Sequence, residues 1–277
     1  PTGTGLVGFA ERFPNRFFDV GIAEQHAVTF AAAMAMRGFT PVFAVYSSFL
    51  QRGFDQIYHD VALQNLHTVF AIDRAGAVGS DGETHQGIYD LSYLSLIPNM
   101  TVMAPSSEGE MRAMLDFAVN ECSGPVAVRY PKGETDTAEY GNGEIQLGKG
   151  VACRRGSDVL IVAIGAELED ACRAAELLEK RGISAGVMNA RFLKPFDSEL
   201  FADMAKGVSA VVTVEDNTVI GGLGAAVAAI YDGTVHMLGF ADKPLRQASV
   251  SEQKHDAGID GEGIAEKISE ILGGKVG

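Results

Sequence analysis

The chain has 277 residues, of which 47% are hydrophobic and 21% are charged, a composition typical of a soluble globular protein with room for two domains. Its formal net charge of −14 argues against nucleic-acid binding, because a phosphate backbone requires a basic surface, and no apolar run approaches the length of a membrane span. Cys122, Cys153 and Cys172 form neither a C-x-x-C pair nor a metal-ligand spacing, and no signal peptide opens the sequence, so we expect buried thiols in a cytoplasmic protein.

The first predicted helix begins at Glu24. A β-like stretch over 17–20 leads to Gly21, and from Glu24 apolar residues recur at helical spacing until Gly38 ends the run. An acidic residue in a first helical turn commonly complements the helix dipole. Taken alone, the pattern therefore favours a structural interpretation of Glu24.

Strands and helices continue to alternate as far as residue 129. A capping box formed by Ser107 and Glu110 is expected to open one of these helices. A glycine-rich loop over 77–87, too polar for a core, contains Asp81 and His85. The predicted strands are 41–46, 67–72, 101–104 and 125–129, and the predicted helices are 47–64, 89–96 and 107–120.

A second alternation follows residues 133–150, which lack periodicity and have the composition of a linker. Its strands are predicted over 158–164, 183–188, 210–214 and 235–238, and its helices over 166–180, after Pro195, over 221–231 and after 262. The pattern predicts an α/β fold of two doubly wound, mainly parallel sheets with helices on both faces. We expect domains over 1–145 and 146–277. Because no strand and helix precede the opening loop, the first domain is expected to be N-terminally incomplete.

Five motifs occur in order in the first half: D-V-G-I-A-E-Q-H-A-V-T at 19–29, Y-S-S-F-L-Q-R at 46–52, D-R-A-G at 73–76, D-G-E-T-H-Q-G at 81–87 and R-Y-P-K-G at 129–133. Together they resemble the pyrimidine-binding domain of the 1-deoxy-D-xylulose-5-phosphate synthase family, thiamine diphosphate enzymes related to transketolase. The second half is similar to the transketolase C-terminal domain through R-F-L-K-P at 191–195 and V-E-D-N at 214–217. The D-R-A-G and D-G-x-T-H-Q-G pair is more specific to the synthases than the E-Q-H element.

The resemblance implies that Glu24, Phe49 and Tyr46 bind the cofactor. Glu24 matches the carboxylate that hydrogen-bonds the pyrimidine nitrogen N1′ and thereby promotes loss of the thiazolium C2 proton, a role that requires a buried side chain. Phe49 matches the aromatic residue that stacks on the pyrimidine, although its spacing alone is typical of the core. Tyr46 lies in the same stretch. His85 resembles the active-site histidine that contacts the reacting atoms and carries protons.

The resemblance also implies a phosphate site. Arg74, after a predicted strand, matches one cation that binds the phosphate of glyceraldehyde 3-phosphate, and Lys132 stands where the family has arginine, which implies a weaker, non-bidentate contact. Arg52 is placed near the substrate pocket, with a helix-surface salt bridge as an equal alternative. Asp81 either orients its loop or forms a simple Asp-Gly turn. His26 supports the helix start or a domain contact.

By the same resemblance, the cofactors are thiamine diphosphate and Mg²⁺. The substrates are pyruvate and D-glyceraldehyde 3-phosphate, and the product, 1-deoxy-D-xylulose 5-phosphate, serves isoprenoid, thiamine and pyridoxal biosynthesis. The string Gly79-Ser80-Asp81-Gly82 lacks the glycine directly before the aspartate of a metal-binding G-D-G run, so no metal site is predicted in this chain. We therefore expect a missing N-terminal diphosphate-binding domain, on the same or a separate chain, a homodimer, and an isolated chain without activity. The alternatives are a β subunit of a 2-oxoacid dehydrogenase and a non-catalytic transketolase-like module.

Overall fold

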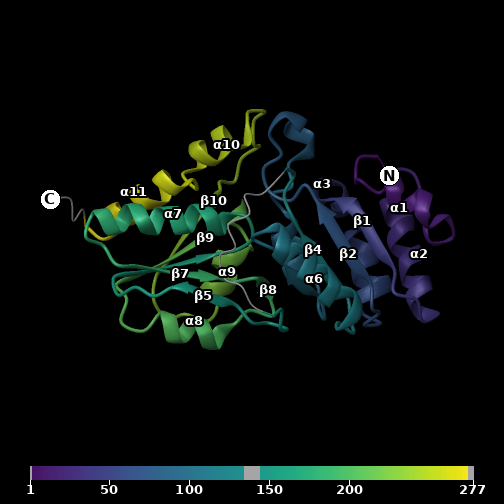
Figure 1. Cartoon of the computed structure of the whole chain (residues 1–277), viewed down its shortest axis with the longest axis horizontal. Coiled ribbons are helices and arrows are strands. Elements are labelled where there is room, and N and C mark those ends of the chain that lie inside the picture. Colours follow the sequence, from purple (N-terminus) through teal and green to yellow (C-terminus); the bar gives the residue numbers. More distant parts are fainter. Residues whose placement is uncertain (1, 134–143, 274–277) are drawn as a thin grey trace.

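The computed structural model describes residues 2–133 and 144–273, which form two five-stranded sheets (Figure 1). The first sheet has the order β1-β2-β4-β3-β8, with β1 Val42–Tyr46, β2 Val69–Asp73, β3 Thr101–Met103, β4 Val126–Arg129 and β8 Phe192–Lys194. The second has the order β10-β9-β6-β7-β5, with β5 Val151–Arg154, β6 Val159–Ala163, β7 Ala185–Asn189, β9 Ala210–Thr218 and β10 Val235–Phe240.

Each sheet is parallel except for one edge strand, which confirms the predicted mainly parallel α/β fold. β8 pairs antiparallel with β3, and β5 pairs antiparallel with β7. Neither of these short strands was predicted from sequence. β8 follows β7 in sequence but completes the first sheet, so the chain crosses from one sheet to the other after Asn189. The boundary near 145 stays a prediction, and residues 134–143 of the expected linker lie outside the described residues.

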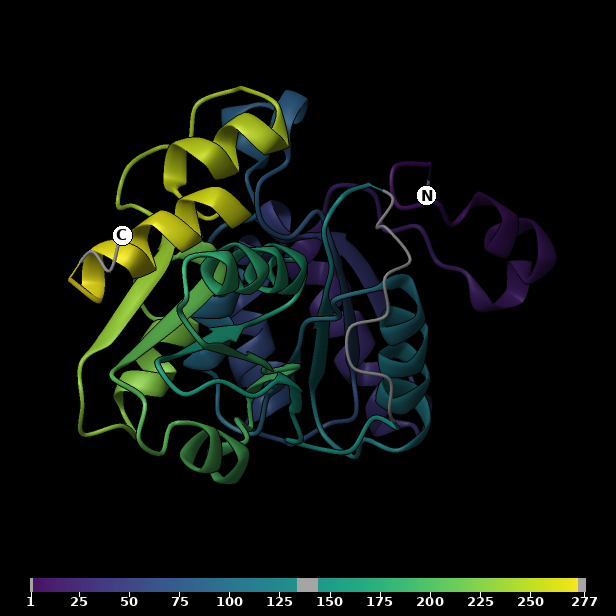
Figure 2. The ribbon, with the colours of Figure 1, turned by 60° about the vertical axis from the view of Figure 1, so that its left-hand side comes forward.

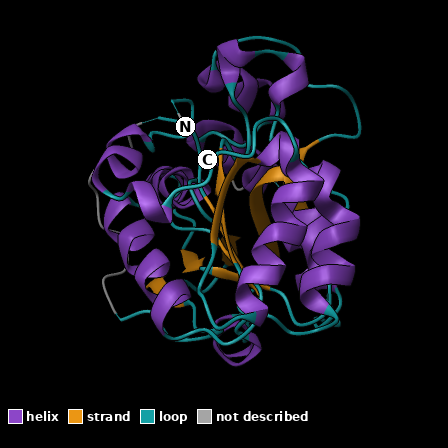
Figure 3. Ribbon diagram, turned by 90° about the vertical axis from the view of Figure 1, so that its right-hand side faces the viewer, coloured by secondary structure: helices purple, strands orange, loops and turns teal. Residues whose placement is uncertain are grey.

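Helices cover both faces of the sheets (Figure 3). In the first half they are α2 Glu24–Met36, α5 Asp90–Ser95 and α6 Glu108–Asn120, and in the second half α7 Glu167–Lys180, α8 Ser198–Met204, α9 Leu223–Ala228, α10 Val250–Ala257 and α11 Gly261–Ile271. Among the described helices none combines the length and the apolar character needed to cross a bilayer.

Alternating side chains of β6 show why its sequence reads as a continuous apolar run. Val159 and Ile161 pack in the cluster that contains the apolar residues of α7 and α11. Leu160 and Val162 point to the opposite face, in the cluster that contains Phe201 of α8 and the apolar residues of α9. Because successive residues of a strand face opposite sides, a sheet covered on both sides needs apolar residues at every position.

Two local expectations are wrong. Residues 17–20 form a loop rather than a strand. The helix expected over 47–64 is a broken helical run, composed of α3 Ser47–Leu50, the 3₁₀ turn η2 Gln51–Gly53, α4 Phe54–Gln56 and the π-helical η3 Ile57–Ala62. Such irregular helical turns are frequent at functional sites.

The capping box predicted at Ser107 is only half formed. The Ser107 hydroxyl accepts the N–H of Glu110 at 3.1 Å, as expected of an N-cap. The Glu110 carboxylate, however, accepts from the backbone and hydroxyl of Ser106 and pairs with the buried Arg191. A long-range ion pair therefore replaces the local return bond to the N-cap.

The three cysteines are half-buried rather than fully buried, and all are free thiols. Burial raises the pKa of the Cys122 thiol to about 11 and that of Cys172 to about 12. At neutral pH these side chains are therefore protonated and weakly reactive, because the thiolate is the nucleophilic form.

The turn before α9 is built on a buried carboxylate, that of Glu215 in β9. Its two oxygens accept the backbone N–H groups of Leu223 at 2.8 Å and Gly224 at 2.9 Å. Position 222 requires glycine where the turn passes the Glu215 carboxylate, because a Cβ there would lie 1.8 Å from Glu215 Oε2. Burial raises the pKa of Glu215 to about 7, although the two backbone hydrogen bonds oppose the shift.

We expect Glu215 to make the unfolding free energy depend on pH. Its pKa lies near 7 in the folded chain and near ~4.3 in the unfolded chain, so the folded state holds more protons between these values. The contribution of Glu215 to the unfolding free energy is therefore fully present below about pH 4. It is lost as pH rises to about 7, by at most about 1.4 kcal/mol per pH unit. Urea titrations between pH 5 and 8 should show this slope in the unmodified chain and lose it in Glu215→Gln. The same slope in both proteins would contradict the assignment.

Candidate active site

Several chemically active side chains meet at the carboxyl edge of the first sheet. In the register of the parallel strands, Tyr46 at the end of β1 lies beside Asp73 at the end of β2, and Ile72 lies beside Arg129 at the end of β4. Arg74 directly follows β2, and Lys132 follows β4 by a short turn. The carboxyl edge is where open α/β sheets place their ligands.

Glu24 occupies the first turn of α2 and is buried. Its side chain is 9% exposed, and its carboxylate lies 3.7 Å from Nη1 of Arg52, which is 59% exposed. Within the described residues no group donates a hydrogen bond to this carboxylate. Gly53 allows η2 to pack closely on α2, because a Cβ there would lie 3.0 Å from Val28 and 3.7 Å from the Glu24 carbonyl oxygen. The salt bridge considered for Arg52 is therefore present, and it reaches Glu24 from a neighbouring helical segment.

Three rings form a continuous aromatic group next to this segment. Tyr46 and Phe49 are stacked, with centroids 5.4 Å apart and an interplanar angle of 19°. The Phe49 ring then meets His85 in a tilted, edge-on contact at 5.3 Å. The Arg74 guanidinium lies 3.8 Å from the centroid of Tyr46, in cation–π geometry. The structure thus brings Phe49 and His85 into contact although they are distant in sequence.

His85 lies in a loop whose two ends are joined by backbone hydrogen bonds. Gly76 and Gly87 exchange two backbone hydrogen bonds of 2.8 Å, so residues 76–87 form a closed loop with a narrow neck. Gln86, which is buried, crosses the loop: its Oε1 accepts the N–H of Val78 at 3.0 Å, and its Nε2 donates to the Gly82 carbonyl at 3.2 Å. No role was predicted for Gln86 from sequence, although it belongs to the D-G-E-T-H-Q-G motif.

The two expected phosphate-binding cations are linked by Asp81. Arg74 pairs with Asp73 at 2.6 Å and with Asp81 at 3.3 Å, and Lys132 pairs with the other oxygen of Asp81. The hydrogen bond from Lys132 holds the pKa of Asp81 below its usual range, whereas burial raises that of Asp73. Asp81 therefore pairs with two cations in addition to its place in an Asp-Gly turn. With both carboxylates ionised, the cluster of Arg74, Lys132, Asp73 and Asp81 has no net charge. The neutralising Asp73 was missed from sequence, although it directly precedes Arg74.

Arg74 itself has a left-handed backbone conformation, with φ of 58°. Few side chains other than glycine, asparagine and aspartate adopt this region readily, so its surroundings must hold it. Its backbone N–H bonds the Asp73 carboxylate at 2.7 Å, and its Nη1 donates to the Gly3 carbonyl at 3.2 Å. Among the described residues none accepts a hydrogen bond from its Nη2, whereas its Nε and Nη1 donate to Asp81, Asp73 and Gly3.

His26 is exposed, and its ring lies parallel to that of Phe30 at 6.1 Å. This contact within α2 agrees with a supporting role at the helix start. It gives His26 no part in the aromatic group of Tyr46, Phe49 and His85.

A buried ion cluster lies beneath the site and was not found from sequence. Arg129, 1% exposed, forms a two-pronged contact with Asp90 of α5, with Nε–Oδ2 at 3.2 Å and Nη2–Oδ1 at 3.1 Å. Its Nη1 pairs with Asp216 of β9. Because Asp216 belongs to the second sheet, this cluster joins the two sheets directly behind the residues that follow β4.

Within residues 2–133 and 144–273, no group of three or more His, Cys, Asp or Glu side chains is arranged to hold a metal ion.

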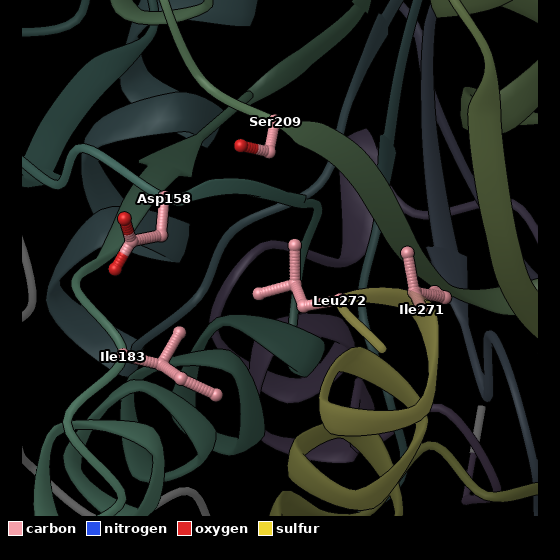
Figure 4. A pocket seen from close by; sticks show the side chains of 5 residues that line it. All are labelled: Asp158, Ile183, Ser209, Ile271 and Leu272. Carbon is pink, nitrogen blue, oxygen red and sulfur yellow. The ribbon is translucent and has the colours of Figure 1, made fainter. Parts of the chain in front are cut away.

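The hollow shown in Figure 4 lies in the second half of the chain and is a poor alternative site. It has a volume of about 230 Å³ and is lined by Asp158, Ile183, Ser209, Ile271 and Leu272. Its carboxylate already accepts the N–H of Ser184 at 2.7 Å, which stabilises the turn before β7. No cation faces it among the lining residues.

Comparisons with known proteins give a match for each half of the chain. The family described as "Transketolase, pyrimidine binding domain" matches residues 1–137, and "Transketolase, C-terminal domain" matches 148–264. A 1-deoxy-D-xylulose-5-phosphate synthase of Geobacter sulfurreducens is 48% identical over 99% of this chain and 44% of its own length. The corresponding protein of Thermomicrobium roseum is 49% identical over 98% and 44%. A solved structure described as a split gene transketolase in an inactive β4 tetramer matches with a TM-score of 0.87 and 33% identity, over 96% of this chain and 88% of that one.

Proposed function

The chain belongs to the transketolase family and corresponds to the C-terminal part of 1-deoxy-D-xylulose-5-phosphate synthases, and on this premise we propose that it supplies the pyrimidine-binding half of a thiamine diphosphate site. The observation that carries the proposal is a buried carboxylate, Glu24, that receives no hydrogen bond from the described residues and lies beside the segment that carries Phe49. A ring nitrogen that shares a proton with this carboxylate would satisfy it.

The residues present fit the aminopyrimidine ring. Glu24 would hold the ring nitrogen N1′ through a hydrogen bond with its carboxylate. Phe49 would offer a stacking face, supported from behind by Tyr46. The bound cofactor supplies the electron sink for decarboxylation of a 2-oxoacid. His85, in contact with Phe49, would carry protons to and from the reacting substrate.

The proposed reaction decarboxylates pyruvate and ligates the two-carbon unit to D-glyceraldehyde 3-phosphate. Arg74 and Lys132 would bind the phosphate, with Asp81 holding the two cations in position. Because Asp73 and Asp81 already balance these cations, a phosphate dianion must compete with Asp81 for them. The Nη2 group of Arg74, which has no acceptor among the described residues, favours such an exchange.

A diphosphate-binding domain, on the same or a separate chain, would complete the site and provide the ligands for Mg²⁺. The chain spans about 44% of the length of the curated relatives that it matches. Residues 2–23, named here the N-terminal arm, carry α1 Val7–Arg12, which has no buried residue and stands away from the sheets (Figure 2). Phe18 is 56% and Ile22 88% exposed, and Gly3 of this arm bonds Arg74. An apolar surface next to the site supports a covering domain, and a homodimer would present two such surfaces.

Reconstitution tests this function. The chain is assayed with thiamine diphosphate, Mg²⁺, pyruvate and D-glyceraldehyde 3-phosphate, with and without a diphosphate-binding domain; the combination is called the complete enzyme below. We expect 1-deoxy-D-xylulose 5-phosphate from the complete enzyme and none from the chain alone. Turnover by the chain alone would refute the need for a second domain. Acyl transfer to a lipoyl group, without ligation to the aldehyde, would identify a 2-oxoacid dehydrogenase β subunit instead.

A further inference from the structure

The tip of the loop that carries Asp81 and His85 rests on the second half of the chain. The N–H of Gly79 donates to Oε1 of Gln253 in α10 at 3.1 Å, and the carbonyl of Ser80 accepts from Nε2 of Gln247 at 3.2 Å. A Cβ at Gly79 would lie 3.2 Å from the backbone nitrogen of Val250 and 3.3 Å from the carbonyl oxygen of Ala248. Figures 1 and 2 both show the segment before α10 next to this loop.

Gln253 is itself held rigidly. It is 1% exposed, and its Nε2 donates to the Arg246 carbonyl at 2.7 Å, so both ends of its amide are bonded. The helix that carries it begins with a complete capping box between Ser249 and Glu252. The next residue, Lys254, pairs with Glu167 and Asp170 of α7 and fastens α10 to the second domain.

The contact lies close to the phosphate-binding cluster. Gly79 and Asp81 share one 3₁₀ turn, η4 Gly79–Asp81, so the backbone position at Gly79 sets that of the carboxylate two residues later. That carboxylate holds both Arg74 and Lys132. The Gln86 cross-link at Val78 makes the turn stiff on its other side. A shift at Gly79 is therefore passed on to Asp81 rather than absorbed by the loop.

We propose that Gln253 is a positioning residue for the phosphate subsite, through which the C-terminal domain fixes the loop turn that holds Asp81 between Arg74 and Lys132. The inference rests on the proposed function and adds to it a role for the C-terminal domain in recognising the phosphorylated acceptor. The bonds from the C-terminal domain reach Gly79 and Ser80 and not His85, so we expect chemistry at the donor substrate to be unaffected.

The test replaces Gln253 by methionine, which has similar length but no acceptor for the Gly79 N–H. In the full chain without ligand, amide exchange at Gly79 should rise about tenfold, as for loss of one buried hydrogen bond. In the complete enzyme, the KM for D-glyceraldehyde 3-phosphate should rise about tenfold, whereas the KM for unphosphorylated glyceraldehyde and the rate of pyruvate decarboxylation should not change. Gln253→Glu keeps an acceptor for the Gly79 N–H but loses the donor to the Arg246 carbonyl, so its exchange rate should fall between those of Gln253→Met and the unmodified chain.

The matched control is Gln64→Met, because Gln64 is an exposed glutamine at the end of a helical segment. This substitution should leave all of these quantities unchanged. Equal exchange at Gly79 in the Gln253→Met and control proteins would overturn the proposal. So would a KM that rises alike for both aldehydes, or a fall in decarboxylation rate, because either would indicate general disruption of the fold. Absence of turnover in the unmodified complete enzyme would refute the proposed function and the phosphate role with it, whereas the exchange result would still decide whether the contact exists.

Discussion

Replacement of Glu24 by glutamine in the complete enzyme is expected to reduce kcat by about 10²–10⁴-fold, the usual contribution of a positioned general acid or base. Glutamine has nearly the same shape, but its amide cannot share a proton with a ring nitrogen in the same way. Among the described residues, the buried carboxylate forms an ion pair with Arg52 alone, at 3.7 Å. Removal of its charge therefore relieves desolvation and should not destabilise the fold.

The measurements are kcat with pyruvate and D-glyceraldehyde 3-phosphate, the rate of C2-proton exchange of bound thiamine diphosphate, and the melting temperature. Glu176→Gln is the matched control, because Glu176 is an exposed residue of α7 in the second domain. It should change none of the three quantities. Unchanged C2-proton exchange in Glu24→Gln would contradict the role assigned to Glu24, and with it the whole assignment of the cofactor site.

Replacement of Arg129 by methionine is expected to lower the unfolding free energy by about 3–5 kcal/mol, the usual cost of breaking a buried ion pair from one side. Arg129 is enclosed by Asp90 and Asp216 and is almost inaccessible to water. Burial alone would lower the pKa of Arg129, but the two carboxylates raise it, so the guanidinium stays charged. Burial also raises the pKa of Asp90. Without Arg129, both carboxylates would be left in the interior without a counter-charge.

Urea denaturation followed by circular dichroism measures this loss. Arg112→Met is the control, because the Arg112–Glu108 pair lies on the surface of α6, with side chains 76% and 55% exposed, and should cost less than about 1 kcal/mol. Arg129→Lys keeps the charge but not the planar fork and should fall between the two. If Arg129→Met destabilises the chain no more than Arg112→Met, the cluster does not join the two sheets energetically.

Central strands could be predicted from sequence better than the two short antiparallel edge strands. The central strands β2, β4, β6 and β7 lie close to the predicted ranges, because burial on both faces requires an unbroken apolar run that periodicity detects. The edge strands β5 and β8 are short and were missed. β8 is part of R-F-L-K-P, a string with no strand periodicity, and it becomes a strand only because β3 offers it an unpaired edge.

The candidate site shows the same division. The helix start at Glu24 was predicted from consecutive residues, whereas the role of Glu24 was assigned from the family resemblance. The alternation of apolar strands with amphipathic helices was enough to predict the α/β fold. Only the tertiary structure placed Phe49 against His85, Asp81 between Arg74 and Lys132, and Gln253 against Gly79. Neighbouring residues determine backbone conformation and which face is buried, and these leave a periodic signal. A contact between residues far apart in the chain depends on how complete elements pack, and no local pattern records it.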